Sequence, residues 1–321
     1  MIAALLLALS SATAGHAPGR VQLDSFWSPA LGTRKQYVVY LPPSYAARSG
    51  RRYPVAYYLH GVFGSERDWT RSGHLDAAMD SLLAAGGREM IIVMPDGDDG
   101  FYTTWNSLGS YSSCLASTRE VTKEPSSTYC VPWPHYDEYI ARDLVAHVDS
   151  VYRTIADRAH RGIAGLSMGG YGAISLALRY PDVFAAAASH SGVISPLYAG
   201  PHPFAVPPRY ATDMDSLRAG WGRMWRYVDG VFGRDSAGWL ARDPRRLAER
   251  LVRAGKPIPA IFIDVGTEDR LADENRAFHW ELSRLAVPSS YAEWPGRHDW
   301  AYWSSHVGQS LAWLMEHIAG G

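Results

Sequence analysis

Five short apolar runs constrain the fold of this chain more than any other sequence feature. They lack the alternation of polar and apolar residues, which is typical of strands covered on both faces. Helical patterns separate and follow these runs. Strands and helices that alternate in this way predict an α/β domain with a mostly parallel central sheet, helices on both faces and right-handed crossovers. The runs are residues 53–59, 90–94, 162–165, 184–188 and 260–265, and the helical patterns are 75–85, 136–152, 168–180, 273–285 and 302–318.

The ends of this pattern and its interruptions predict the remaining parts of the domain. Residues 21–27 and 35–41 are typical of an antiparallel pair of strands that opens the fold, and residues 290–294 of a short last strand. Two long segments, residues 97–134 and about 194–255, interrupt the alternation. Because connections this long usually carry function, we expect the second to form a cap-like lid or a pocket wall.

The composition narrows the class of protein. The chain has 321 residues, 47% of them hydrophobic, and its 31 Lys and Arg residues balance 32 Asp and Glu residues. These values exclude intrinsic disorder, and the net charge of -1 argues against a nucleic-acid partner. No segment after the N-terminal run approaches 18 uninterrupted apolar residues, so we expect no membrane span. We expect one domain over residues 15–321.

The N-terminus and the cysteines both bear on the compartment. Residues 1–14 combine a short apolar run with small residues that end in Ala14, which predicts a cleaved signal peptide and a secreted or periplasmic protein. A buried N-terminal helix or strand is the alternative. In an exported protein, Cys114 and Cys130 would form one disulfide across a long loop. In a cytosolic protein, both would be free thiols.

A nucleophilic serine is predicted by the sequence Gly165-Leu-Ser-Met-Gly169, which matches the pattern G-x-S-x-G. The motif follows a predicted strand and opens a predicted helix, the position where the pattern has a mechanical meaning. The turn strains the serine backbone and exposes its hydroxyl above the sheet, while the flanking glycines let neighbouring backbone pass. Ser167 is therefore the predicted nucleophile.

A serine hydroxyl needs a base, and the base needs an orienting acid. In this type of fold the chain order is serine, acid, histidine, so both partners are sought downstream. Asp269 lies on the turn after the strand at residues 260–265 and is the predicted acid, with Glu268 in reserve. His298 follows residues 290–294 on a loop at the same edge and is the predicted base. The remaining candidates are Asp264, inside a strand, Asp273, and the helical His279 and His306.

Two backbone amides are predicted to hold the oxyanion of the tetrahedral intermediate. One is the N–H of Met168, directly after the nucleophile. The other is the N–H of Val62, in the His-Gly turn that ends the strand at residues 53–59. His60 precedes Ser167 in the chain, so we expect it to shape that turn and not to act as the base.

These motifs resemble the Putative esterase family of α/β-hydrolases, which includes S-formylglutathione hydrolase (esterase D), feruloyl and acetyl esterases and mycolyltransferases. The likeness to small-ester tributyrin esterases looks strongest. It implies an α/β-hydrolase fold, with Ser167, Asp269 and His298 as a catalytic triad and Val62 and Met168 as the oxyanion hole. Segments 107–133 and 194–227 look longer than in the compact small-ester enzymes. The matching blocks are residues 59–64, 68–69, 93–97, 165–172, 230–233, 266–269 and 298–300.

The sequence therefore predicts a secreted serine carboxylesterase that hydrolyses small acyl esters, acetyl, butyryl or feruloyl in type, through an acyl-enzyme. The expected substrate is a small-molecule or glycan-linked ester, and no cofactor or metal is expected. The acidic turn Asp96-Gly-Asp-Asp-Gly100 lacks the glutamate of a calcium loop. An acyltransferase of the mycolyltransferase type with the same triad is the first alternative, and a non-catalytic binding module on this scaffold is the second.

Twelve tryptophans are more than a core of this size ordinarily holds. Several fall on loops expected near the catalytic edge of the sheet. We hypothesise that part of them forms an aromatic rim for a sugar or phenolic group, with Trp69, Trp105, Trp225 and Trp300 as substrate contacts. The alternative is that they pack the long insertions onto the domain.

Overall fold

The computed structural model describes residues 17–105, 112 and 130–318, and its core is one eight-stranded sheet. The strand order is β1-β2-β4-β3-β5-β6-β7-β8. β1 is antiparallel to β2, and β2 is antiparallel to β4. The other six strands, β3 to β8, are parallel to one another. The strands are β1 (Arg20–Ser28), β2 (Thr33–Leu41), β3 (Val55–Leu59), β4 (Ile91–Pro95), β5 (Arg161–Leu166), β6 (Ala186–His190), β7 (Ala260–Gly266) and β8 (Ser289–Trp294).

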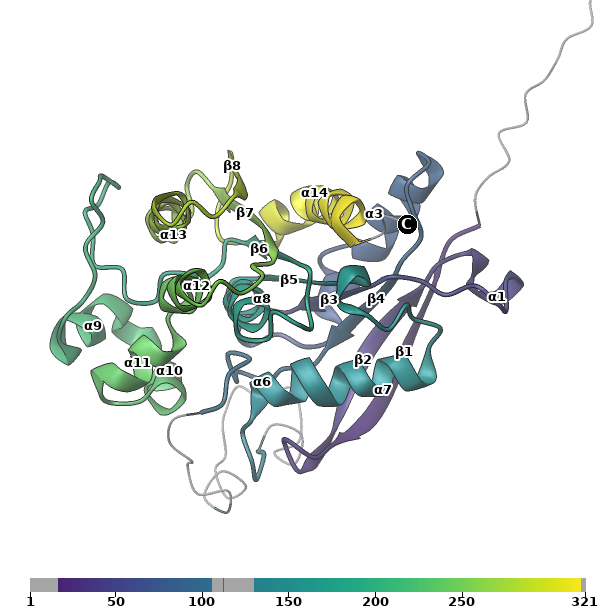
Figure 1. Ribbon diagram of the computed structural model, residues 1–321, viewed down its shortest axis with the longest axis horizontal. Helices are drawn as coiled ribbons and strands as arrows, with labels where there is room; N and C mark the ends of the chain where they lie inside the picture. The colour runs from purple at the N-terminus through teal and green to yellow at the C-terminus, as the bar shows by residue number, and fades with distance from the viewer. Residues whose placement is uncertain (1–16, 106–111, 113–129, 319–321) are drawn as a thin grey trace, which may run out of the picture.

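Helices cover both faces of the sheet (Figure 1). One face carries α6 (Tyr136–Glu138), the π-helical turn η1 (Tyr139–Leu144), α7 (Val145–Val151), α8 (Met168–Arg179), α12 (Pro244–Arg253) and α13 (Ala272–Arg284). The other carries α2 (Asp68–Arg71), α3 (Leu75–Ala84) and α14 (Trp300–Ile318). The remaining helical segments are α1 (Ser44–Ala47), η2 (Arg158–His160), α9 (Met214–Trp221), η3 (Gly222–Met224), α10 (Trp225–Phe232) and α11 (Ser236–Arg242).

The predicted fold class, an α/β-hydrolase fold with a mostly parallel sheet, is confirmed, and the predicted strands and helices lie within about two residues of the observed ones. Two details differ. The helix predicted over 136–152 is interrupted by the π-helical turn η1. The interrupting segment 194–255 has helices of its own, and α9, α10 and α11 gather at one side of the sheet, on the left in Figure 1.

Two predictions fall outside the described residues. The proposed signal peptide over residues 1–14 lies there, and so does Cys114, one half of the predicted disulfide. Its partner Cys130 is buried. In the described part of the chain, every helix is too short or too polar to cross a membrane.

A buried ion cluster, not predicted from the sequence, joins β2 to the turn after β4. The Lys35 ammonium lies 2.5 Å from Asp96 Oδ2 and 2.8 Å from Asp98 Oδ1, and the lysine side chain is 1% exposed. Burial lowers the pKa of Lys35, but the two carboxylates raise it by more, so the ammonium stays charged. The acidic turn read from the sequence is therefore bound to a lysine of the neighbouring strand.

Replacing Lys35 by alanine should destabilise the protein strongly, because it leaves two buried carboxylates without their cation. We expect a loss of about 3–5 kcal/mol in the free energy of unfolding, measured by urea denaturation. Arg48→Ala, at an exposed arginine, is the control and should change stability by less than about 0.5 kcal/mol. Equal stability of wild type and Lys35→Ala would contradict the structural role of the cluster.

Candidate active site

Ser167 lies at the sharp turn between β5 and α8. Its backbone has φ 53° and ψ -115°, a conformation that residues with a Cβ atom seldom adopt. Two backbone hydrogen bonds hold the turn: the Ser167 N–H donates to the carbonyl of His190 at 3.0 Å, and the N–H of Val193 donates to the carbonyl of Ser167 at 3.2 Å. The nucleophile predicted from the motif is therefore fixed to the end of β6.

The glycines of the motif are required by close backbone contacts. A Cβ atom on Gly165 would lie 2.4 Å from backbone atoms of Gly169. A Cβ on Gly169 would lie 2.3 Å from the carbonyl oxygen of Leu59 and 2.6 Å from that of His60. Neither distance is possible for a real side chain, so the first turn of α8 can approach β3 only with glycine there.

The structure brings Ser167, His298 and Asp269 together. His298 Nε2 lies 2.9 Å from Ser167 Oγ. On the opposite side of the ring, His298 Nδ1 lies 2.9 Å and 3.1 Å from the two carboxylate oxygens of Asp269. The three residues come from the ends of β5 and β7 and from the loop between β8 and α14, at the carboxyl edge of the parallel strands.

Asp269 is held as an anion. Burial raises the pKa of its carboxyl group, but the hydrogen bond and charge of His298 and the amide of Leu271 lower it by more, so the net shift is downward. The reserve candidate Glu268 is exposed, and its carboxylate pairs with Arg297 at 3.0 Å. The structure thus places Asp269, and not Glu268, against the histidine.

The turn after β3 passes beside Ser167. A Cβ on Gly61 would lie 3.6 Å from the Cβ of Ser167, which puts the Gly61–Val62 peptide next to the serine. The carbonyl of Gly61 accepts hydrogen bonds from the Gly64 N–H at 3.1 Å and from His60 Nδ1 at 2.7 Å. Because the carbonyl and N–H of a trans peptide point in opposite directions, these two bonds turn the Val62 N–H away from them.

The hydrogen bonds of His60 assign its ring proton. The N–H of Gly97 donates to Nε2 at 2.9 Å, which leaves Nδ1 as the donor to the carbonyl of Gly61. Asp96 Oδ1 lies 3.6 Å from the same Nε2. The Phe63 N–H donates to Asp99 Oδ1 at 2.7 Å and fixes the next peptide of the turn. His60 therefore shapes this turn, as expected from its place in the chain.

A second histidine–aspartate pair lies under the nucleophile and was not predicted as such. His190 Nδ1 lies 2.7 Å from Asp264 Oδ2, and both side chains are fully buried. His190 Nε2 lies 2.7 Å from Ser310 Oγ, and Asp264 Oδ1 accepts the hydroxyl of Tyr302 at 3.2 Å. Because the carbonyl of His190 accepts the Ser167 amide, this network supports the strand end to which the nucleophile is bound. Asp264, expected from its position inside a strand to be structural, lies in this buried network.

The predicted aromatic rim needs correction at Trp69. Its side chain is 1% exposed, its indole N–H donates to the carbonyl of Leu59 at 3.0 Å, and its ring packs edge-on against Trp300. A side chain so enclosed cannot stack on a substrate. Trp300 is half-buried and also packs on Trp303, whose ring lies 5.0 Å from that of His298. Trp303 thus packs against the His298 ring, and Trp300 and Trp69 pack in turn behind Trp303.

The other two rim candidates pack partly onto the core. Trp105 stacks on Tyr136, with ring centroids 6.0 Å apart, and Trp225 stacks on Trp239 at 5.6 Å. Both are half-buried. Packing of the insertions accounts for these contacts, and a part in substrate binding stays a prediction for Trp105, Trp225 and Trp300.

The fold and the three converging side chains define the class of protein, an α/β-hydrolase. The chain belongs to the Putative esterase family, whose family model matches residues 28–314.

Two curated relatives give the comparison in sequence. Esterase Rv1288 of Mycobacterium tuberculosis is 30% identical over 281 residues, which cover 85% of this chain and 54% of the relative. The chain thus spans about half the length of that relative. The acetyl esterase of Caldicellulosiruptor saccharolyticus is 25% identical over 262 residues, which cover 81% of this chain and 82% of the relative.

Solved structures give the comparison in fold. A ferulic acid esterase aligns with a TM-score of 0.67 and 26% identity over 93% of this chain and 98% of its own. The S-formylglutathione hydrolase FrmB from Staphylococcus aureus aligns with a TM-score of 0.68 over 93% of this chain and 100% of its own. At 23% identity, the second likeness shows the fold alone.

Gly169→Ala should destroy the turn that carries Ser167, because the added methyl group meets backbone oxygens that cannot move aside. We expect a loss of more than about 2 kcal/mol in the free energy of unfolding, or insoluble protein. Gly308→Ala in α14 is the matched control, since a Cβ there meets nothing within 4 Å. It should stabilise the helix by about 0.5–1 kcal/mol. Equal thermal stability of the two variants would contradict the close approach.

Proposed function

We propose that this protein is a serine carboxylesterase that works through an acyl-enzyme intermediate. The observation that carries the proposal is the position of His298, whose two ring nitrogens lie within hydrogen-bond distance of Ser167 on one side and Asp269 on the other. This is the arrangement in which a serine gains a base and the base gains an orienting carboxylate. Membership of the esterase family supports the same reaction class.

The geometry supports the following steps. His298 Nε2 accepts the proton of Ser167 as Oγ attacks the ester carbonyl, and Asp269 stabilises the imidazolium that forms. The tetrahedral intermediate collapses when His298 returns the proton to the departing alcohol oxygen, leaving the acyl group on Ser167. Water then attacks the acyl carbon with His298 again as the base. His298 returns this proton to Ser167 Oγ as the acyl–oxygen bond breaks, and the carboxylic acid leaves. No step requires a cofactor.

The oxyanion of the intermediate would be bound by the amides of Met168 and Val62. Met168 is the first residue of α8, where free amides and the helix dipole favour negative charge. The bonds from His60 and Gly64 to the carbonyl of Gly61 support the second donor, because they hold the Val62 N–H in its direction before substrate binds. A donor held in advance needs no reorganisation in the transition state.

Small acyl esters are the proposed substrates. The relatives include proteins named acetyl esterase and ferulic acid esterase, which supports acetyl and feruloyl groups as acyl parts. The N-terminal sequence supports export of the protein. We therefore place the enzyme outside the cytoplasm, acting on esters of small-molecule or glycan alcohols.

Removing the nucleophile or the acid should each abolish most of the turnover of p-nitrophenyl acetate. Ser167→Ala removes the attacking oxygen, and Asp269→Asn leaves His298 without its charged partner, so that kcat falls by about 10³–10⁴-fold. Glu268→Gln is the matched control, because this neighbouring carboxylate is exposed and bound to Arg297. Activity that survives in Ser167→Ala, or an equal loss in Glu268→Gln, would contradict the assignment.

The role of His60 can be separated from that of the catalytic base. His60→Leu removes the donor to the carbonyl of Gly61 and should lower kcat about 10²-fold with little change in KM, because the Val62 amide is no longer held. His60→Asn keeps an N–H donor near the position of Nδ1 and should recover part of the activity. Steady-state kinetics on p-nitrophenyl acetate measures both, and the same kcat for the two variants would rule out this role.

A further inference from the structure

Two tryptophans expose more than half of their side chains, and both lie at the β1–β2 hairpin. Trp27, near the end of β1, is 58% exposed, and Trp133 is 55% exposed. A Cβ on Gly32, in the hairpin turn, would lie 2.9 Å from the Trp133 ring, so this indole lies against the turn. The two most exposed tryptophans therefore lie at the hairpin.

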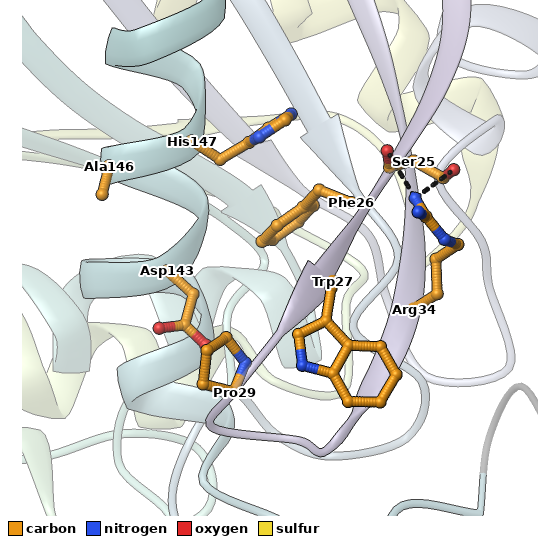
Figure 2. Close-up of a pocket in the computed structure, with 8 residues that line it drawn as sticks. All are labelled: Ser25, Phe26, Trp27, Pro29, Arg34, Asp143, Ala146 and His147. Carbon is orange, nitrogen blue, oxygen red and sulfur yellow. Dashed lines mark hydrogen bonds between the residues drawn. The ribbon is translucent and has the colours of Figure 1, made fainter.

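Trp27 lines a pocket of about 450 Å³ that wraps around the open edge of β1 (Figure 2). Ser25 and Arg34 line it on the same face of the sheet as Trp27, and the Arg34 guanidinium donates to the carbonyl and the hydroxyl of Ser25 at 3.2 and 3.3 Å. Phe26 and His147 line it from the other face, where their rings stack 4.7 Å apart. The volume is within the range of small-ligand sites.

Polar residues lie next to Trp27 on its own face of the strand pair. Across the strand pair, Trp27 faces Arg34, and the next pair on that face is Ser25 with Gln36. Asp143 of η1 lines the pocket from the opposite face of β1, the face of Phe26 and His147, and accepts the Ser28 hydroxyl at 2.6 Å through Oδ2. An exposed indole with hydrogen-bonding residues on the same face fits a sugar ring, which presents C–H groups on its face and hydroxyls at its edge. Unpaired backbone groups of an edge strand add further donors and acceptors.

A protein partner fits this surface less well. The other exposed apolar residues of β1, Val21 and Leu23, lie at least four residues from Trp27, with Ser25 between. Protein interfaces ordinarily bury a contiguous core with charged residues depleted. Here the cross-strand partner of Trp27 is a charged residue, Arg34, whose guanidinium bonds to Ser25. The second exposed indole at the hairpin, Trp133, lies against the turn at Gly32.

Sheet register places this pocket on the catalytic edge. β1 runs in the same direction as β4 and β5, because it is antiparallel to β2 and β2 is antiparallel to β4. Tyr37 pairs with Pro95, and Leu59 pairs with Gly165. Continuing the register of Tyr57 and Val93 by two residues puts all four in one row across the sheet. Toward the carboxyl ends of the parallel strands, Ser167 lies two residues beyond this row and Arg34 three. Trp27, the partner of Arg34, therefore lies within one residue of the height of the nucleophile.

The lateral separation is set by the strand order. β1 and β5 are four strand positions apart in the sheet, which corresponds to about 20 Å at about 4.8 Å per strand. This is too far for one small ester to touch both places. A chain of several sugars can span it.

We propose that the pocket at Trp27 is a glycan-binding subsite that holds one part of a polysaccharide while an ester group carried by the same chain reaches Ser167. Delivery of the ester to Ser167 rests on the proposed esterase function, whereas glycan binding at Trp27 does not. The substrate class is an ester on a glycan chain, and the hairpin recognises the glycan. Trp27 supplies the stacking surface, and Arg34 and Asp143 supply hydrogen bonds to hydroxyls.

Binding can be tested without catalysis. The Ser167→Ala protein should bind at least one of xylohexaose, cellohexaose, mannohexaose and arabinohexaose in isothermal titration calorimetry. Adding Trp27→Ala should weaken that binding about ten-fold or more, and Trp27→Phe should keep part of it. Leu240→Ala, at an exposed apolar residue of α11, is the matched control and should leave the affinity unchanged. No binding to any of the four, or equal affinity with Trp27→Ala, would overturn the proposal.

Kinetics distinguishes failure of the subsite from failure of the esterase function. In the catalytically intact protein, Trp27→Ala should raise KM for acetylated xylan while kcat/KM for p-nitrophenyl acetate stays at the wild-type value. Equal loss on both substrates would show a structural effect and overturn the subsite. Wild type without activity on p-nitrophenyl acetate would reject the esterase and leave the calorimetric result to decide on the subsite. A dimer of the wild type that Trp27→Ala converts to monomers would assign the surface to a second copy instead.

Discussion

The turn at Ser167 is the constraint on which the rest of the site depends. A serine with φ 53° keeps this conformation only because the surrounding backbone requires it. On one side, glycine lets α8 approach the end of β3. On the other, the carbonyl of His190 accepts the serine amide, and the fully buried side chain of His190 is packed against Asp264 and Ser310. The hydroxyl is therefore held at the sheet edge by elements far apart in sequence.

The same edge collects every other group that the proposed reaction needs. Parallel strands present their carboxyl ends together, so the turn after β3, the loop after β7 and the loop after β8 meet around the serine. Each loop is fixed by a few contacts. The His60 bonds fix the first, the amide of Leu271 on Asp269 fixes the second, and the indole of Trp303 supports His298 in the third. Rigid strands thus set the position of residues carried on loops.

Local patterns in the sequence were sufficient for the strands, the helices and the residues that the structure brings together. The motif around Ser167, and the order of serine, acid and histidine, depend on short-range features that a single sequence displays. What could not be predicted depends on pairings across the sheet. In the sequence, Lys35 is a single charged residue on a predicted strand. Only the pairing of β2 with β4 brings it next to Asp96 and Asp98. The burial of single side chains could not be predicted either. Trp69 was therefore assigned to a substrate rim, although it lies in the core.

Labelling with a fluorophosphonate tests the central claim most directly, because this probe reacts with a serine only where a base and an oxyanion site activate it. Peptide mapping by mass spectrometry should find one modified residue in the folded protein, Ser167, and no modification after denaturation or in His298→Ala. Labelling at another serine, or equal labelling of Ser167 in His298→Ala, would contradict the account.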